Sequence, residues 1–256
     1  MLSLLLKHGR HRLFFFVPPR AEGSLPSPRI YPAFRMIRTV IFDMDGVIVD
    51  TEPVHRYAYF RHFEELGIQV SDEEYASFTG ASTKNVYQHL KEQYGLAQPV
   101  EELVMGKREF FNRAFDEKPD LDLLDGVRTL IEDLHQHNFQ LILASSASKS
   151  TIDRVMRRFG IGPYFTDLIS GEDFPRSKPD PAIFEFAASR STAPKTECVV
   201  IEDSANGVTA AKAAGLYCIG YSSEHSPLQD LSHADVVVGH FAELSAARIA
   251  AFDTAK

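Results

Sequence analysis

The chain has 256 residues, of which 44% are hydrophobic and 24% are charged, and its formal net charge at pH 7 is −8. This length and composition predict a globular protein with a substantial core in one or two domains. The acidic balance disfavours binding to nucleic acid or to an anionic membrane surface, so we expect neither as a partner.

Residues 1–35 differ from the rest of the chain. They carry six basic residues against one acidic residue, and five prolines lie between positions 18 and 32. Their two apolar runs are much shorter than the roughly 20 residues that a membrane-spanning helix needs. We expect an N-terminal extension without fixed structure, either a targeting segment or the product of a misassigned start upstream of Met36.

Residues 37–52 predict a buried strand that delivers two carboxylates. The β-branched and aromatic run 40–42 ends at Asp43 and Asp45. Residues two apart in an extended backbone point the same way, so both side chains can enter one small volume. Two such charges about 4 Å apart repel by roughly 4 kcal/mol at an effective dielectric near 20, so the pair needs a cation or a proton. Taken alone, Asp-x-Asp-Gly is also a common turn sequence.

Helical periodicity follows over the next part of the chain. The pattern predicts helices over 53–66, from an N-terminal signature at 71–74, over 83–94 and over 100–115. Pro53 suits the first turn of the first helix, and Gly67 ends it. Because these helices come between the first strand and the next, we expect an inserted helical cap over residues 53–121.

Strands and helices then alternate. Apolar strands are predicted at 139–144, 167–170, 198–201, 217–220 and 236–238, with helices between them. This pattern indicates a parallel sheet that is covered on both faces. The predicted fold class is therefore α/β, a Rossmann-like parallel sheet with helices on both faces. We expect residues 36–52 and 122–256 to form this core.

Two cysteines, Cys198 and Cys218, lie within predicted strands. Two isolated cysteines in apolar runs are typical of buried free thiols in a reducing compartment. We therefore expect a cytoplasmic protein.

Polar residues also follow later strands of the predicted sheet. Ser145 and Ser146 follow one strand, Glu202 and Asp203 follow another, and Lys178 lies in a loop, Ser-Lys-Pro-Asp-Pro. Ligands of such sheets bind beyond the carboxyl ends of the strands. The residue before a proline is held extended, so Lys178 is presented rigidly. Each feature alone has a plain alternative, such as a solvated lysine or helix-start acidity.

Together these motifs resemble those of the haloacid dehalogenase superfamily. They are D-M-D-G-V-I-V-D from Asp43, Ser145 after an apolar strand, S-K-P-D-P around Lys178, and E-D-S-A-N-G from Glu202. Within the superfamily the chain is similar to the branch with a small helical cap, which includes β-phosphoglucomutase and many small phosphatases. The resemblance covers residues 36 to about 252.

The resemblance implies that Asp43 attacks phosphorus to form a phosphoaspartyl intermediate, while Asp45 acts first as an acid and then as a base. It also implies that Asp43, Asp203 and the backbone carbonyl of Asp45 hold Mg²⁺, with Glu202 as a direct or water-mediated ligand. Lys178 would balance the negative charge of the transferring phosphoryl group.

The resemblance further implies a set of groups that contact substrate. Ser145 would donate a hydrogen bond to the phosphoryl oxygens, with Ser146 as the alternative because Ser-Ser-Ala-Ser leaves the register uncertain by one. Gly46, His55 and Lys84 are the remaining expected substrate-binding positions.

Phosphatase and phosphomutase activity are separated by details of the predicted cap. Asp45 favours phosphoryl transfer over dehalogenation, and His55 stands where the mutase carries a cap histidine. However, Thr83 occupies the place of the arginine that holds the second phosphate in the mutase, and Lys84 is only a possible substitute.

We therefore expect Mg²⁺-dependent hydrolysis of a small phosphomonoester, such as a sugar phosphate. A β-phosphoglucomutase-type phosphomutase is the alternative, and a non-catalytic module that binds a phosphorylated ligand is the third possibility. The expected partner is a small phosphorylated metabolite, and the expected state is a monomer or a weak homo-oligomer.

Overall fold

The computed structural model describes residues 36–78, 81–222 and 229–252. The expectation for residues 1–35 lies outside these ranges. Within them, no helix combines the length and the apolarity that crossing a bilayer requires.

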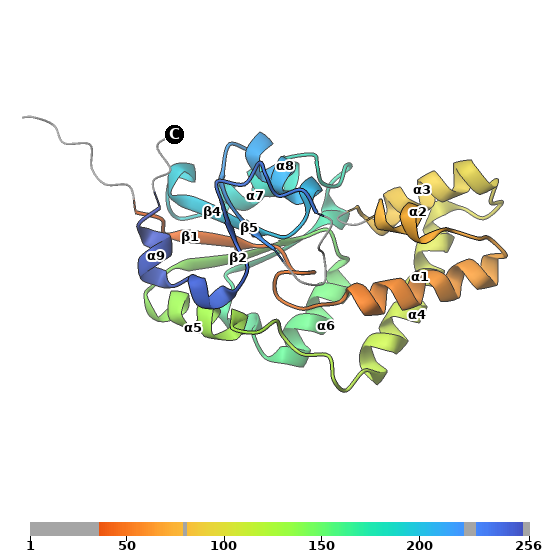
Figure 1. Ribbon diagram of the computed structural model, residues 1–256, viewed down its shortest axis with the longest axis horizontal. Helices are drawn as coiled ribbons and strands as arrows, with labels where there is room; N and C mark the ends of the chain where they lie inside the picture. Colours follow the sequence, from red (N-terminus) through yellow and green to blue (C-terminus); the bar gives the residue numbers. More distant parts are fainter. Residues whose placement is uncertain (1–35, 79–80, 223–228, 253–256) are drawn as a thin grey trace, which may run out of the picture. The chain divides into compact units, whose positions relative to one another are not determined.

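A parallel sheet forms the centre of the described chain (Figure 1). Its strands are β1 (Thr39–Phe42), β2 (Gln140–Ser145), β3 (Asp167–Ser170), β4 (Cys198–Glu202), β5 (Tyr217–Tyr221) and β6 (Val236–Val238). Their order is β3-β2-β1-β4-β5-β6, and β1 is hydrogen-bonded to both β2 and β4. Because all these pairs are parallel, the carboxyl ends of the strands meet at one edge of the sheet.

Helices cover both faces of this sheet. Side chains alternate along β1, so that Val40 and Phe42 enter one core and Ile41 enters the other. The first core is closed by α5 (Val127–Gln136), α6 (Lys149–Phe159) and α9 (Ala246–Ala250), and the second by α7 (Ala182–Ser189) and α8 (Ala205–Ala213). The predicted fold class is confirmed, and all six predicted strands are present.

Four helices are inserted between β1 and α5. They are α1 (Glu52–Leu66), α2 (Asp72–Ala76), α3 (Thr83–Tyr94) and α4 (Val100–Glu117). Ser71 and Ser82 cap the second and third helices by accepting backbone N–H bonds, and Gly67 ends the first with φ 68°.

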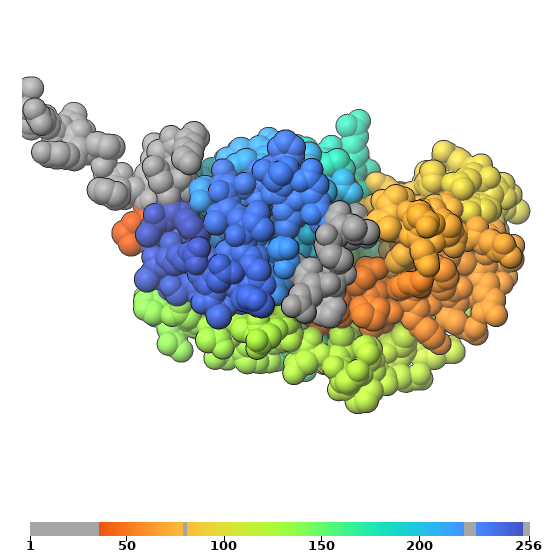
Figure 2. All heavy atoms as spheres, viewed as in Figure 1, coloured from red at the N-terminus to blue at the C-terminus, as the bar shows by residue number. Residues whose placement is uncertain are grey.

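The insertion has a hydrophobic cluster of its own, whose largest members include Tyr59, Phe63 and Tyr87. It lies beyond the carboxyl ends of the strands and forms a separate lobe, drawn in orange to yellow-green in Figure 2. The position of this lobe is the one expected for a cap, and the domain bounds 53–121 stay a prediction.

Candidate active site

The end of β1 carries the first two predicted site residues. Asp43 is 6% exposed, and its backbone N–H still donates to Ile201 O of β4 at 3.0 Å. The turn that follows depends on Gly46, which has φ 81°. A Cβ at this position would lie 2.0 Å from Asp203 Oδ2, so only glycine lets this turn pass the second acidic loop. Gly46 therefore lines the site through its backbone.

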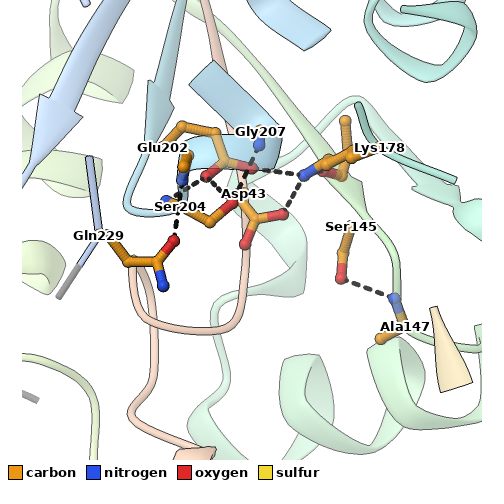
Figure 3. A network of polar contacts seen from close by, with 10 residues as sticks. Asp43, Ser145, Ala147, Lys178, Glu202, Ser204, Gly207 and Gln229 are labelled. Atoms are coloured by element: carbon orange, nitrogen blue, oxygen red, sulfur yellow. Dashed lines mark hydrogen bonds and ion pairs between the residues drawn. The ribbon is translucent and has the colours of Figure 1, made fainter. Parts of the chain in front are cut away.

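Lys178 is buried between two carboxylates (Figure 3). Its Nζ donates to Asp43, to Glu202 Oε1 at 2.8 Å and to Ala144 O at 3.3 Å. Burial alone would lower the pKa of this lysine, but the charges of Asp43 and Glu202 raise it above its usual value. The side chain is therefore held as a cation against Asp43.

Glu202 supports Lys178 from the far side. Its Oε1 accepts from the lysine, and its Oε2 accepts from the backbone N–H and the hydroxyl of Ser204 at 2.8 and 3.0 Å. A Cβ on Gly207 would lie 1.7 Å from Glu202 Oε1, so the first turn of α8 must have glycine there. Both oxygens of Glu202 are thus engaged by protein groups. The expected role of Glu202 as a direct or water-mediated metal ligand stays a prediction.

Asp43 and Asp203 form a buried acidic pair. Burial raises the pKa of Asp43 to about 7, an effect that Lys178 opposes and that Glu202 and Asp45 strengthen. Burial and the charges of Glu202 and Asp43 raise the pKa of Asp203 well above its usual value. Elevated pKa values of this kind mark carboxylates that need a further cation when both are ionised.

Asp45 lies in a different environment from Asp43. Burial favours its neutral form, but His55 and Thr51 hold its pKa below the usual value. The Thr51 hydroxyl donates to Asp45 Oδ1, and His55 Nε2 lies 3.7 Å from the same oxygen. His55, as predicted from the sequence, therefore reaches the site from α1.

Lys107 is a site residue that the sequence reasoning missed. Its Nζ lies 2.6 Å from His55 Nδ1 and packs over the rings of Tyr59 and Phe111 at 4.4 and 4.9 Å. Burial lowers the pKa of this lysine to about 7. The signal was present, because Lys107 interrupts the apolar stripe of α4 at the i+4 spacing that links buried Leu103 to buried Phe111.

Replacing Lys107 by methionine is expected to stabilise the fold. The folded pKa lies below the value of the unfolded chain, so the native state carries the full cost of the buried charge below pH 7. This cost falls as the pH rises from 7 towards 10.5. Urea unfolding should show Lys107→Met about 2–4 kcal/mol more stable at pH 7, with a smaller gain at pH 9.

A matched control is Lys118→Met, which removes a lysine at the end of the same helix whose side chain is 35% exposed. It should change stability by less than about 1 kcal/mol at either pH. A destabilised Lys107→Met protein would show that the lysine is a packing element and not a cost to the fold.

The two candidate serines differ in burial and in their position relative to the cavity. Ser145 is the last residue of the strand and is fully buried, and its Oγ accepts the N–H of Ala147 at 3.0 Å. Ser146, the first residue after the strand, lines the cavity that contains Asp43 and Lys178. Ser146 is therefore the serine of this pair that the cavity wall includes, and the choice between the two as a substrate-binding residue stays a prediction.

A cavity of about 120 Å³ gathers these groups between the sheet edge and the insertion. The predicted residues that line it are Asp43, Asp45, Gly46, His55, Ser146, Lys178, Glu202 and Asp203. Lys84 is not among the residues of this wall. It lines an adjoining cavity of about 330 Å³, which shares Thr83 and Ser146 with the first.

Known proteins share the fold and part of the sequence of this chain. The family model of haloacid dehalogenase-like hydrolases matches residues 40–221. The phosphorylated carbohydrates phosphatase of Thermotoga maritima is 32% identical over 74% of this chain and 87% of its own length.

Two solved structures with somewhat lower sequence identity share the fold. The CbbY protein of Rhodobacter sphaeroides, solved with xylulose-(1,5)bisphosphate, has 27% identity and a TM-score of 0.75, with 82% of this chain and 96% of that chain covered. The β-phosphoglucomutase of Clostridium difficile has 26% identity and a TM-score of 0.74, with 84% and 96% covered.

The chain therefore belongs to the haloacid dehalogenase-like hydrolases, in the branch similar to β-phosphoglucomutase. The predicted family is confirmed, as is the prediction that the protein is an enzyme.

Proposed function

We propose that the protein is a Mg²⁺-dependent phosphatase that hydrolyses a small phosphomonoester. The observation that carries the proposal is the buried contact of Lys178 with Asp43 at the end of β1, with Asp203 across the same cavity. The phosphatase name of the Thermotoga relative supports the same reaction class. In this proposal residues 53–121 act as the cap, which contributes His55, Thr83 and Lys107 to the site.

The reaction divides into two displacements at phosphorus. In the first, an Asp43 carboxylate oxygen attacks phosphorus, the bond between phosphorus and the ester oxygen breaks, and Asp45 gives its proton to the leaving oxygen. In the second, ionised Asp45 takes a proton from water, the water oxygen attacks phosphorus, and Asp43 is released with inorganic phosphate. Lys178 stays charged throughout and faces the oxygens that gain negative charge.

Asp45 depends on its neighbours for its proton. Before substrate binds, the Asp45 carboxyl group is ionised near neutral pH because its pKa is held low. His55 beside it and Lys107 behind His55 form a contiguous chain of titratable groups that reaches into the insertion. Burial and the charge of Lys107 lower the pKa of His55, so this imidazole holds its proton weakly. When Lys107 is charged it can give a proton to His55 Nδ1 while His55 Nε2–H gives one to Asp45, which leaves Lys107 neutral and Asp45 protonated for the first displacement.

The donor set fits a hard divalent ion. The carboxylates of Asp43 and Asp203 and the carbonyl of Asp45 are oxygen ligands of the kind that Mg²⁺ takes, and they leave positions for phosphate and water. In the part of the chain that the structure describes, no three His, Cys, Asp or Glu side chains form a complete metal site. A site made of two carboxylates, one backbone carbonyl and substrate oxygens would suit Mg²⁺ and would not contain three such side chains. The ion, when bound, would neutralise the phosphoryl oxygens.

A phosphomutase is the second candidate, because His55 lies beside Asp45 and β-phosphoglucomutase is a structural neighbour. Thr83 and Lys84 stand where the mutase interpretation needs an arginine that holds the second phosphate. Lys84 also lies outside the cavity of about 120 Å³ that contains Asp43 and Lys178, which we call the phosphoryl cavity. A non-catalytic binding module is disfavoured, since Asp43, Asp45 and Lys178 are all present and line one cavity.

The deciding experiment is a phosphate-release screen over phosphorylated metabolites with Mg²⁺, run beside an isomerisation assay with β-glucose 1-phosphate and its bisphosphate. We expect phosphate release from at least one monoester, and we expect excess EDTA to reduce its rate by at least about 100-fold. Added Mg²⁺ should restore the rate. Isomerisation without phosphate release would replace the phosphatase by the mutase.

A further inference from the structure

The larger cavity beside the phosphoryl cavity has room for the rest of a substrate, and the inference drawn from it rests on the proposed function. The phosphoryl cavity holds about 120 Å³, whereas its neighbour holds about 330 Å³ and opens from the same residues, Thr83 and Ser146. One wall of the larger cavity is apolar, with Met105 of α4 and Phe174 of the core. The other walls carry charges, and their arrangement decides what can bind.

The charges on these walls are balanced. Lys84 and Arg108 come from the insertion, and Glu101 and Glu172 oppose them. Arg108 is already neutralised, because one of its terminal nitrogens lies 2.6 Å from Glu172 Oε1. The larger cavity therefore offers no surplus of positive charge to a second anionic group.

Glu172 also binds a second group that could receive an anion, the N-terminus of α6. Its Oε2 accepts the backbone N–H of Lys149, the first residue of α6, at 3.0 Å. The backbone of Glu172 is fixed as well, since its N–H donates to Ser170 Oγ at 3.2 Å. A guanidinium and a helix N-terminus are two common anion-binding groups in proteins, and here the carboxylate of Glu172 binds both.

We propose that Glu172 is a specificity-determining residue that selects a neutral, hydroxyl-bearing leaving group and rejects one that carries a second phosphate. An ionised carboxylate accepts hydrogen bonds from hydroxyls and repels an anion placed on the same partners. The relative CbbY is solved with a bisphosphate, so the fold itself admits a second phosphate. Exclusion in this chain comes from a side chain and not from the backbone.

The test measures dissociation constants for fructose 6-phosphate and fructose 1,6-bisphosphate by calorimetry with Mg²⁺. The full chain carries Asp43→Asn so that neither ligand is consumed. We expect the monophosphate to bind at least about tenfold more tightly, a moderate ratio because the Glu172 side chain is 41% exposed. Adding Glu172→Gln should tighten bisphosphate binding about tenfold or more and change monophosphate binding less than about threefold, since the amide can still accept from Lys149.

The matched control is Asp173→Asn. This neighbouring acid pairs with Lys149 Nζ at 2.6 Å and is not part of the cavity wall, so its loss should leave the ratio unchanged. Equal binding of the two ligands, binding of neither, or a ratio that Glu172→Gln does not alter would overturn the inference. A failure of the proposed function would instead appear as the absence of phosphate release in the metabolite screen.

Discussion

Asp43→Asn is expected to abolish phosphate release while making the metal-free protein more stable. An amide is not a nucleophile, so turnover should fall by about 10⁴-fold or more. The folded pKa of Asp43, about 7, lies above that of the unfolded chain. The native state therefore binds more protons between pH 4 and 7, and its stability falls as the pH rises through this range.

Asp43→Asn removes this pH-dependent loss of stability, because the amide does not ionise. With EDTA present, urea unfolding should show Asp43→Asn about 2–4 kcal/mol more stable than the parent at pH 8, and similar to it near pH 4. Asp167→Asn is a suitable control, because it removes an aspartate that pairs with Arg190 at the surface. An inactive protein that is also destabilised at pH 8 would contradict the buried, repelled state that we assign to Asp43.

Lys178→Met is expected to have the opposite effect on stability and a comparable effect on activity. Removing one partner of a buried ion pair leaves uncompensated carboxylates, which costs about 3–5 kcal/mol. The deficit should grow as the pH rises from 5 to 8, because Asp43 loses its proton across this range and then lacks the cation that faces it.

Chemical unfolding at pH 5, 6.5 and 8 measures this trend. Lys212→Met provides the comparison, since Lys212 pairs with Asp235 at 2.5 Å near the surface and its loss should cost less than about 1 kcal/mol. A pH-independent deficit for Lys178→Met would show that the side chain contributes through packing alone.

Most of the fold was predictable from local sequence patterns. Apolar strands, helical periodicity and caps such as Ser71, Ser82 and Gly67 act within a few residues, so they can be read without tertiary contacts. The remaining errors lie at element ends, where α4 continues to Glu117 and β2 includes Ser145.

Site residues were predictable from the sequence only where they directly follow the end of a strand. For this reason Asp43 and Asp203 both line the cavity at the carboxyl ends of the strands. The role of Glu202 depends on which way its carboxylate turns. That direction is set by Ser204, two residues away, and by Lys178, which is 24 residues away in sequence. The sequence could not separate Ser145 from Ser146, because their difference in burial depends on where β2 ends and on what packs around that end.

The cap contribution was the least predictable part. Lys107 reaches His55 across 52 positions of sequence, and Glu172 meets Arg108 across 64. Neither pair has a spacing that any local periodicity would reveal. A charged residue within an apolar helical stripe, as at Lys107, is the kind of signal that can be sought in advance.

The acidic wall opposite the nucleophile comes late in the chain, because Asp203 directly follows β4, which pairs with the central strand β1. A truncated product that stops before residue 198 would retain Asp43 and Lys178 and lose both this wall and a neighbour of β1. A premature stop codon there should therefore be as damaging as the loss of the first motif. The same reasoning makes any fragment that ends before residue 198 unsuitable for ligand screening.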